Sequence, residues 1–176
     1  VMGGSQGASI LSSVVPVALA QLPQPLKDRL HISHQARKAD HDAVANCYDQ
    51  AGLRADIRPF FSDIPERLEK AHLVISRSGA SSVADISVIG RPSVLVPLAI
   101  AIRGEQLANA RGLEGAGAAI VLEETVFDAA NLGRILAELL SDPNKLAEMA
   151  AGALSVARPD AVDRLAEQVL ALGEAI

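Results

Sequence analysis

The stretch Gly3-Gly4-Ser5-Gln6-Gly7-Ala8 constrains this chain more than any other part of its sequence. It stands between a short strand, Val1–Met2, and a long apolar helix predicted over Ala8–Ala20. Glycine lets the backbone turn sharply and approach a ligand, and a helix N-terminus presents unpaired N–H groups to an anion. Ser5 adds a hydroxyl donor. The stretch therefore predicts a phosphate-binding turn, although a tight strand-to-helix turn without a ligand is the alternative.

Short apolar strands alternate with helices along the rest of the chain. Further strands are predicted at Leu30–Gln35, Ala55–Phe60, Leu73–Ile75, Val94–Val96 and Ala119–Leu122. Further helices are predicted at Asp40–Ala51, Ile64–Lys70, Ser81–Ile89, Glu105–Gly115, Asp128–Leu140, Pro143–Val156 and Asp160–Leu172. Such alternation is typical of a parallel sheet with both faces covered. We therefore expect an α/β fold, a Rossmann-like parallel sheet with helices on both faces, which binds ligands at the carboxyl ends of its strands.

The composition argues against several classes of protein. The net charge is −5 and aromatic residues make up 2% of the 176 residues, which does not suit a nucleic-acid-binding surface. The single cysteine, Cys47, excludes an internal disulfide. The longest apolar run, around 93–102, is interrupted by Pro97 and falls short of a membrane span. Because a strand begins at residue 1, we expect residues 1–176 to be one domain of a longer protein.

A dinucleotide-binding Rossmann domain is the first alternative for a glycine turn of this kind. That class carries Gly-x-Gly-x-x-Gly and an acidic residue at the end of the second strand, which holds the ribose. Here the second strand ends in His34-Gln35-Ala36-Arg37, without an acidic residue. The sequence therefore disfavours a nicotinamide cofactor, and no cofactor is expected. No metal is expected either, because His31, His41 and His72 lack the spacing of metal ligands.

A second glycine turn, Arg77-Ser78-Gly79-Ala80, lies between the buried strand at 73–75 and the next helix. Arg77 can offer its guanidinium to a phosphate, and Ser78 its hydroxyl. In the following helix, Asp85 can accept hydrogen bonds from both hydroxyls of a ribose. The alternative for Asp85 is a carboxylate in the first turns of a helix, where the helix dipole favours it.

Two further pairs of residues suit a nucleotide sugar. Phe60-Phe61 ends a strand, where a planar base can rest while backbone groups read its edge; core filling is the alternative. Glu105-Gln106 begins a helix and offers a carboxylate and an amide to the hydroxyls of a sugar. A capping role for Glu105 is the alternative.

Taken together, these stretches resemble the C-terminal, donor-binding domain of MurG-type glycosyltransferases. That family adds N-acetylglucosamine to undecaprenyl-pyrophosphoryl-MurNAc-pentapeptide (lipid I) and so makes lipid II. The likeness covers nearly the whole chain in the same order, and the ordered set is specific where each motif alone is weak. It includes Gly3–Ala8, His34-Gln35, Phe60 with Asp63 and Ile64, Ser76–Ala80, Gly90-Arg91-Pro92 through Val96-Pro97, and Gln106 with Asn109-Ala110.

The resemblance implies the C-terminal half of a GT-B glycosyltransferase, an inverting hexosyltransferase that needs no metal. Such an enzyme serves peptidoglycan synthesis, and with it cell-wall biogenesis, cell shape and cell division. It is peripheral to the cytoplasmic face of the bacterial inner membrane. Its donor is UDP-N-acetylglucosamine, whereas lipid I and the membrane surface are bound by an N-terminal domain that is absent from residues 1–176. No catalytic residue is therefore assigned in this chain.

The resemblance also assigns the donor contacts. The expected substrate-binding residues are Gly4, Ser5, Gln6, Gly7, Phe61, Arg77, Ser78, Gly79, Asp85, Glu105 and Gln106. The first glycine turn contacts the diphosphate, and the backbone of Phe61 reads the uracil. Asp85, which stands where the family is expected to carry Glu, holds the ribose. Glu105 and Gln106 hold the sugar, and the apolar segment 98–102 before them replaces a loop that is usually polar.

Two other functions remain open. The chain could act alone as a non-catalytic UDP-sugar-binding subunit that recruits a separate catalytic partner. It could also belong to a related UDP-sugar enzyme such as a 2-epimerase. An epimerase wants additional carboxylates and a histidine near the sugar, which the apolar segment 98–102 does not offer.

Overall fold

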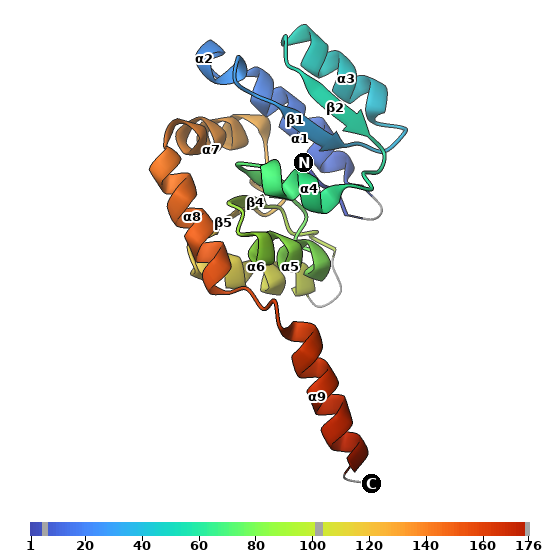
Figure 1. Cartoon of the computed structure of the whole chain (residues 1–176). Helices are drawn as coiled ribbons and strands as arrows, with labels where there is room; N and C mark the ends of the chain where they lie inside the picture. Colours follow the sequence, from blue (N-terminus) through green and yellow to red (C-terminus); the bar gives the residue numbers. More distant parts are fainter. Residues whose placement is uncertain (5–6, 101–103, 175–176) are drawn as a thin grey trace.

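The computed structural model describes residues 1–4, 7–100 and 104–174. In chain order its elements are α1 (Ser9–Ala20), α2 (Gln24–Lys27), β1 (Ile32–Gln35), α3 (His41–Gln50), β2 (Ala55–Arg58), α4 (Ile64–Lys70), β3 (Val74–Ser76), α5 (Ala80–Ile89), β4 (Ser93–Leu95), α6 (Glu105–Gly115), β5 (Ala119–Val121), α7 (Ala129–Ser141), α8 (Pro143–Ser155) and α9 (Ala161–Glu174). Helices and strands alternate as predicted, which confirms the α/β fold (Figure 1). The sequence did not predict α2, a four-residue helix with a proline in its first turn.

Two groups of parallel strands are joined through Val1–Met2. In one group β1 pairs with β2, and in the other β3 pairs with β4 and β4 with β5. The nitrogen of Val1 donates to Ser33 O at 2.7 Å, and the amide of Met2 donates to Ile75 O at 2.9 Å. The spatial order is therefore β2, β1, Val1–Met2, β3, β4, β5. This is the order of doubly wound nucleotide-binding sheets, and its switch point lies between Val1–Met2 and β3.

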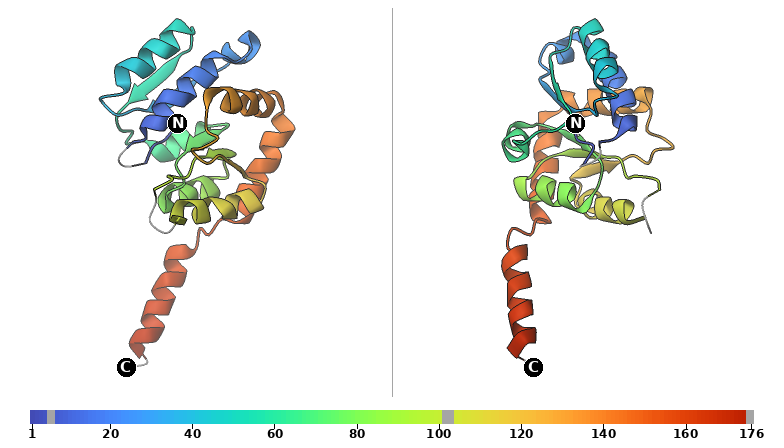
Figure 2. Two further views of the ribbon diagram at one scale, coloured as in Figure 1. Left: turned by 180° about the vertical axis from the view of Figure 1, so that it is seen from behind. Right: turned by 90° about the vertical axis from the view of Figure 1, so that its right-hand side faces the viewer.

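Helices cover both faces of the sheet, because the central strands are apolar on both sides (Figure 2). Val74 and Leu95 belong to one buried cluster, with side chains of α5 and α6. Ile75 and Val94, their neighbours along the same strands, belong to a second cluster with side chains of α1 and α7. Successive residues of a strand point to opposite faces, so an uninterrupted apolar strand needs a helical layer on each side.

The helix α9 projects away from the rest of the chain (Figure 1). Its exposed large apolar side chains are Val162, Leu165, Val169, Leu170 and Leu172. No helix in the described ranges combines the length and the apolarity that a bilayer crossing requires.

Candidate functional site

A cavity of about 230 Å³ lies at the carboxyl ends of the strands, beside the switch point. It is lined by Met2, Gly4, Gln35, Phe60, Phe61, Ile64, Ser82 and Asp85. Three of the substrate-binding residues expected from the sequence, Gly4, Phe61 and Asp85, thus border one cavity although they lie far apart along the chain. Ligands of open α/β sheets bind in this position.

The first glycine turn has no room for larger residues. A Cβ on Gly3 would lie 2.4 Å from the backbone nitrogen of Ala8. Gly7 has a φ of +69°, and a Cβ there would lie 2.5 Å from Cγ of Arg37. At Gly4, by contrast, a Cβ would meet no atom within 4 Å. The turn is therefore tight on its inner side and open toward the cavity; Ser5 and Gln6 lie outside the described residues.

The side chain of Gln35 fixes this turn to the neighbouring strand. Its Oε1 accepts a hydrogen bond from the amide of Gly3 at 3.3 Å. Its Nε2 donates to Gly4 O at 3.2 Å and to Pro59 O at 3.3 Å. Gln35 was expected only as part of the family motif. The structure makes it a wall of the cavity and a link between the glycine turn and the segment before Phe60.

Three helices that begin near the strand tips lack a capping side chain at the N-cap position. The N-cap residues are Ala8 for α1, Gly79 for α5 and Gly104 for α6. By contrast, Asp128 and Asp142 cap α7 and α8 by accepting hydrogen bonds from backbone amides. The first amides of α1, α5 and α6 thus have no side-chain acceptor at the N-cap. A bound anion can supply such acceptors.

Asp85 lies in the second turn of α5. That helix begins at Ala80 and has no acidic residue in its first turn. The influence of the helix dipole falls off beyond the first turn, so the dipole does not explain the position of Asp85. Ser82, three residues earlier on the same helical face, lines the same cavity. Ser82 was not among the site residues expected from the sequence, although its spacing from Asp85 could have identified it.

Phe60 and Phe61, which follow β2, differ in exposure. The ring of Phe61 is buried, as the core-filling alternative proposed, and the guanidinium of Arg67 lies 3.9 Å from its centroid. Only the backbone of Phe61 is therefore offered to a ligand. Phe60 is 69% exposed and lines the cavity. Arg67 also donates to Asp63 at 2.9 Å, and this hydrogen bond lowers the pKa of the Asp63 carboxyl.

The second glycine turn is tied to α6 by hydrogen bonds. The hydroxyl of Ser78, which is fully buried, donates to Gln106 O at 2.8 Å. The side chain of Asn109 donates to Ser78 O at 3.2 Å. The backbone amide of Leu98 donates a hydrogen bond to Oε1 of the Gln106 side chain at 3.1 Å. The structure thus brings the second turn and Gln106 together.

Gly79 and Glu105 stand at the starts of two helices. Gly79 is the N-cap of α5, and a Cβ there would meet nothing within 4 Å. Glu105 is exposed and is the first residue of α6, whose N-cap is Gly104; no side-chain hydrogen bond caps that helix. Of the apolar segment 98–102, the structure describes Leu98 to Ile100, and Ile100 is 85% exposed.

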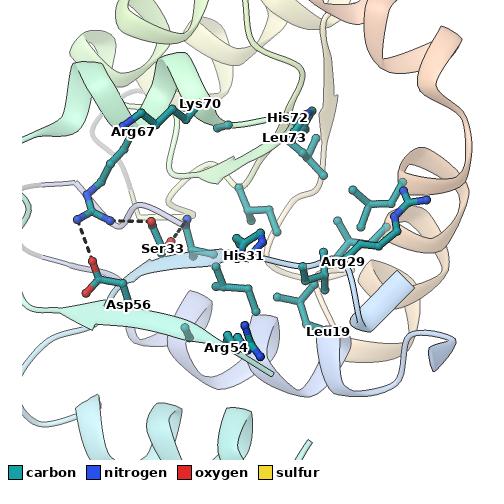
Figure 3. A pocket seen from close by; sticks show the side chains of 18 of the residues that line it. Leu19, Arg29, His31, Ser33, Arg54, Asp56, Arg67, Lys70, His72 and Leu73 are labelled. Carbon is teal, nitrogen blue, oxygen red and sulfur yellow. Dashed lines mark hydrogen bonds and ion pairs between the residues drawn. The ribbon is translucent and has the colours of Figure 1, made fainter. Parts of the chain in front are cut away.

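A larger cavity of about 1020 Å³ lies at the opposite, amino-terminal ends of the strands (Figure 3). Arg67 crosses its edge and donates to Ser33 at 2.7 Å and to Asp56 at 2.8 Å. Because ligands of this fold bind at the carboxyl ends, the smaller cavity is the candidate site. In the ranges that the structure describes, no three His, Cys, Asp or Glu side chains group in a way that could hold a metal ion.

The matching family model and two similar curated proteins point to one family. The family model described as "Glycosyltransferase family 28 C-terminal domain" matches residues 1–165. The chain is 48% identical, over all of its length, to a UDP-N-acetylglucosamine–N-acetylmuramyl-(pentapeptide) pyrophosphoryl-undecaprenol N-acetylglucosamine transferase from Chelativorans sp. (strain BNC1). It is 45% identical, over 98% of its length, to the transferase of the same name from Paramagnetospirillum magneticum (strain ATCC 700264 / AMB-1). It covers 48% and 46% of these two proteins, so it spans about half the length of such relatives.

Solved structures give the same result for the fold. The crystal structure of Acinetobacter baumannii MurG superposes with a TM-score of 0.88 at 32% identity, over 96% of this chain and 50% of that one. The glycotransferase of kitacinnamycin superposes with a TM-score of 0.62 at 18% identity, over 95% of this chain and 42% of its own, which shows the fold alone. These likenesses confirm the Rossmann-like α/β fold of one half of a GT-B glycosyltransferase.

Proposed function

Because this chain belongs to the family of glycosyltransferase family 28 C-terminal domains, we propose that it is the UDP-N-acetylglucosamine-binding domain of an inverting hexosyltransferase. The whole enzyme transfers N-acetylglucosamine to undecaprenyl-pyrophosphoryl-MurNAc-pentapeptide, the step from lipid I to lipid II in peptidoglycan synthesis. Two relatives, from Chelativorans and Paramagnetospirillum, bear the name of that transferase. The observation that carries the proposal is the cavity at the switch point, which Gly4, Phe61 and Asp85 border together.

The diphosphate lies against the first glycine turn and the starts of α1 and α5. The turn is open at Gly4, and both helices begin without a capping side chain. Backbone amides at a helix N-terminus, together with the helix dipole, suit a doubly charged phosphate group. Ser5, Gln6 and Gly7 of the turn and Gly79 at the start of α5 complete this part of the proposed site.

The uridine occupies the cavity between the end of β2 and α5. The backbone at Phe61 reads the edge of the uracil, while the exposed ring of Phe60 covers the base. Asp85 accepts hydrogen bonds from the ribose hydroxyls, and its position in the second turn of α5 supports this role. The sugar lies toward Glu105 and Gln106, at the start of α6.

The proposed reaction is a direct displacement at the anomeric carbon of the donor sugar. The acceptor hydroxyl attacks, the bond to the diphosphate breaks, and UDP leaves with one more negative charge. The N-termini of α1 and α5 stabilise this developing charge more strongly than the charge of the bound donor, and such a difference lowers the barrier. The general base and the contacts to lipid I and to the membrane surface belong to the part of the enzyme outside residues 1–176.

Calorimetric titration of this chain with UDP tests the proposal. We expect UDP to bind and no sugar to be transferred. Asp85→Asn should weaken UDP binding roughly 10- to 100-fold, because a hydrogen bond to a charged acceptor contributes roughly 1.5–3 kcal/mol. Asp49→Asn, an exposed carboxylate on α3, is the matched control and should leave the affinity unchanged.

The analogue 2′-deoxy-UDP makes the test specific to the ribose. Wild type should bind it more weakly than UDP, whereas Asp85→Asn should bind the two nucleotides equally. Absence of UDP binding to wild type would overturn the proposed function. Equal discrimination by wild type and variant would remove Asp85 from the ribose site.

A further inference from the structure

The side chain of Arg77 connects three segments at the carboxyl edge of the sheet. Its Nη1 donates to the backbone oxygens of Val96 and Pro97, both at 3.1 Å, in the segment that follows β4. The same nitrogen lies 2.6 Å from Oε1 of Glu124, which follows β5. The two side chains are largely buried, with 11% of Arg77 and 25% of Glu124 exposed. Two carbonyl oxygens thus accept the hydrogen bonds of Nη1, and the contact with Glu124 is an ion pair in which Oε1 accepts no hydrogen bond from the described residues. In this mostly buried place the charge of the carboxylate and the two carbonyl oxygens fix the guanidinium together.

A second set of hydrogen bonds joins the same region to α6. Ser78, next to Arg77, donates to the backbone oxygen of Gln106, and the amide of Leu98, next to Pro97, donates to the Gln106 side chain. Gln106 is thereby held from both sides, by the second glycine turn and by the segment after β4. Arg77, which is paired with Glu124, connects the second glycine turn to the segment after β4. Glu124 has no part in the cavity lining.

We propose that Glu124 and Arg77 form a positioning pair that sets Gln106 relative to the start of α5, and so the sugar subsite relative to the diphosphate. This inference rests on the proposed function. Arg77 therefore acts through Val96 and Pro97 in place of the direct phosphate contact expected from the sequence. Glu124 neutralises the guanidinium, so that it remains with the two carbonyl oxygens when a diphosphate binds nearby.

The two roles for Arg77 predict opposite effects of removing the Glu124 charge. If Arg77 were a phosphate ligand, Glu124→Gln would release its guanidinium and strengthen UDP binding. If Arg77 is a positioning residue, the same change leaves the binding of UDP nearly unchanged. It weakens the binding of UDP-N-acetylglucosamine, because only this ligand carries the sugar that contacts Gln106. The adjacent exposed carboxylate gives a matched control, Glu123→Gln, with the same change of charge.

Calorimetry on the chain with UDP and with UDP-N-acetylglucosamine measures the difference. For Glu124→Gln we expect the affinity for the sugar nucleotide to fall about fivefold, the effect of one hydrogen bond, while the affinity for UDP changes less than about twofold. Glu123→Gln should match wild type with both ligands. Glu124→Asp, which keeps the charge, should recover part of the lost affinity. Tighter UDP binding by Glu124→Gln, or equal losses with both ligands, would overturn the positioning role.

Hydrogen exchange without a nucleotide tests the pair independently of the proposed function. Glu124→Gln should speed the exchange of the Leu98 amide, which depends on the position of Gln106, and Glu123→Gln should not. Equal exchange in the two variants would refute the pair. If the wild-type chain fails to bind UDP while the exchange at Leu98 responds as expected, the proposed function fails and only the structural coupling stands.

Discussion

His34 and Tyr48 are a polar pair inside the core, one residue along β1 from Gln35. The ring Nδ1 of His34 and the hydroxyl of Tyr48 share a hydrogen bond of 2.8 Å, and both side chains are almost completely buried. In the part of the chain that is described, Nε2 of His34 finds no partner. Burial lowers the pKa of His34 to about 3 and raises the pKa of Tyr48. His34 therefore stays neutral in the folded chain throughout the physiological range.

The burial of His34 predicts that the free energy of unfolding decreases as the pH falls below about 6.5. In the unfolded chain His34 takes up a proton below about pH 6.5, whereas in the folded chain it does so only near 3. The unfolded state thus binds more protons between these values, and the free energy of unfolding decreases by about 1.4 kcal/mol per pH unit as pH falls. The stabilisation from neutral His34 is complete above pH 6.5.

Urea denaturation between pH 5 and 7 checks this expectation. His34→Asn should show a shallower dependence of the free energy of unfolding on pH than wild type. His72→Asn, at an exposed histidine between α4 and β3, serves as the control and should keep the wild-type slope. Parallel curves for wild type and His34→Asn would show that His34 titrates alike in both states.

At this scale the sequence identified residue types better than their partners. The glycines of the first turn could be picked out because a sharp turn of the backbone requires glycine. Asp85 could be picked out because it is a carboxylate in an otherwise uncharged helix that follows the second glycine turn. The role of Gln35 could not be recognised, since it depends on the carbonyl of Pro59, 24 residues away, coming within 3.3 Å. For the same reason the sequence offered Arg77 and Ser78 as ligand donors, whereas the structure engages both with backbone oxygens from other segments.

Among the elements, α7 and α8 begin with a side-chain cap, and the helices beside the candidate site do not. Asp128 and Asp142 cap α7 and α8, away from the candidate site, while α1 and α5 begin at Ala8 and Gly79 beside it. Gly79 has φ of −62° and ψ of 150°, an extended conformation that suits a capping residue, and space for a side chain. A cap is therefore sterically possible at α5.

We expect Gly79→Asp to raise stability and lower nucleotide affinity together. The new carboxylate would accept hydrogen bonds from the first amides of α5 and raise the free energy of unfolding by about 0.5–1 kcal/mol, or roughly 2 °C in Tm. It would also occupy the anion position, so UDP binding should weaken about tenfold or more. Gly79→Ala, which adds a Cβ without charge, should show neither effect. Unchanged UDP binding by Gly79→Asp in calorimetry would show that the diphosphate lies elsewhere.

The order and type of the elements were predictable because short apolar strands and amphipathic helices carry different periodicities. The ends of the elements that the structure forms agree with the prediction to within two residues, whereas Val1–Met2, predicted as a strand, forms only an isolated parallel bridge from Met2 to Ser76. An unpredicted element is α2, which lies in a stretch with two prolines, Pro23 and Pro25, where the sequence predicted neither a helix nor a strand. Proline is tolerated in the first turn of a helix, so the same residues also suit a helix start.

On the scale of the whole molecule, α9 stands apart from the core. Its exposed side chains Val162, Leu165, Val169 and Leu172 recur at intervals of three and four residues. That repeat forms one apolar stripe along the helix. Such a stripe favours association between molecules when nothing covers it.

Removal of residues 161–176 should leave the folded core intact. We expect Tm to change by less than about 2 °C, because α9 contributes nothing to the two buried clusters, and concentration-dependent association in sedimentation to decrease. Removal of residues 143–176 is the contrasting variant. It also deletes Met149 and Ala153 from the core and should lower Tm markedly. A large loss of Tm from the shorter deletion would show that α9 stabilises the core.

The uncapped N-termini of α1 and α5 also affect the stability of the protein without a bound nucleotide. These two helix starts are about seventy residues apart in the sequence, and neither Ala8 nor Gly79 offers its first amides a side-chain acceptor. One diphosphate would accept hydrogen bonds from the N-termini of both helices at once. It would thereby connect the two groups of strands on either side of the switch point. The melting temperature should then rise with the logarithm of the nucleotide concentration. The nucleotide-bound protein should also resist heat denaturation and proteolysis better than the nucleotide-free protein.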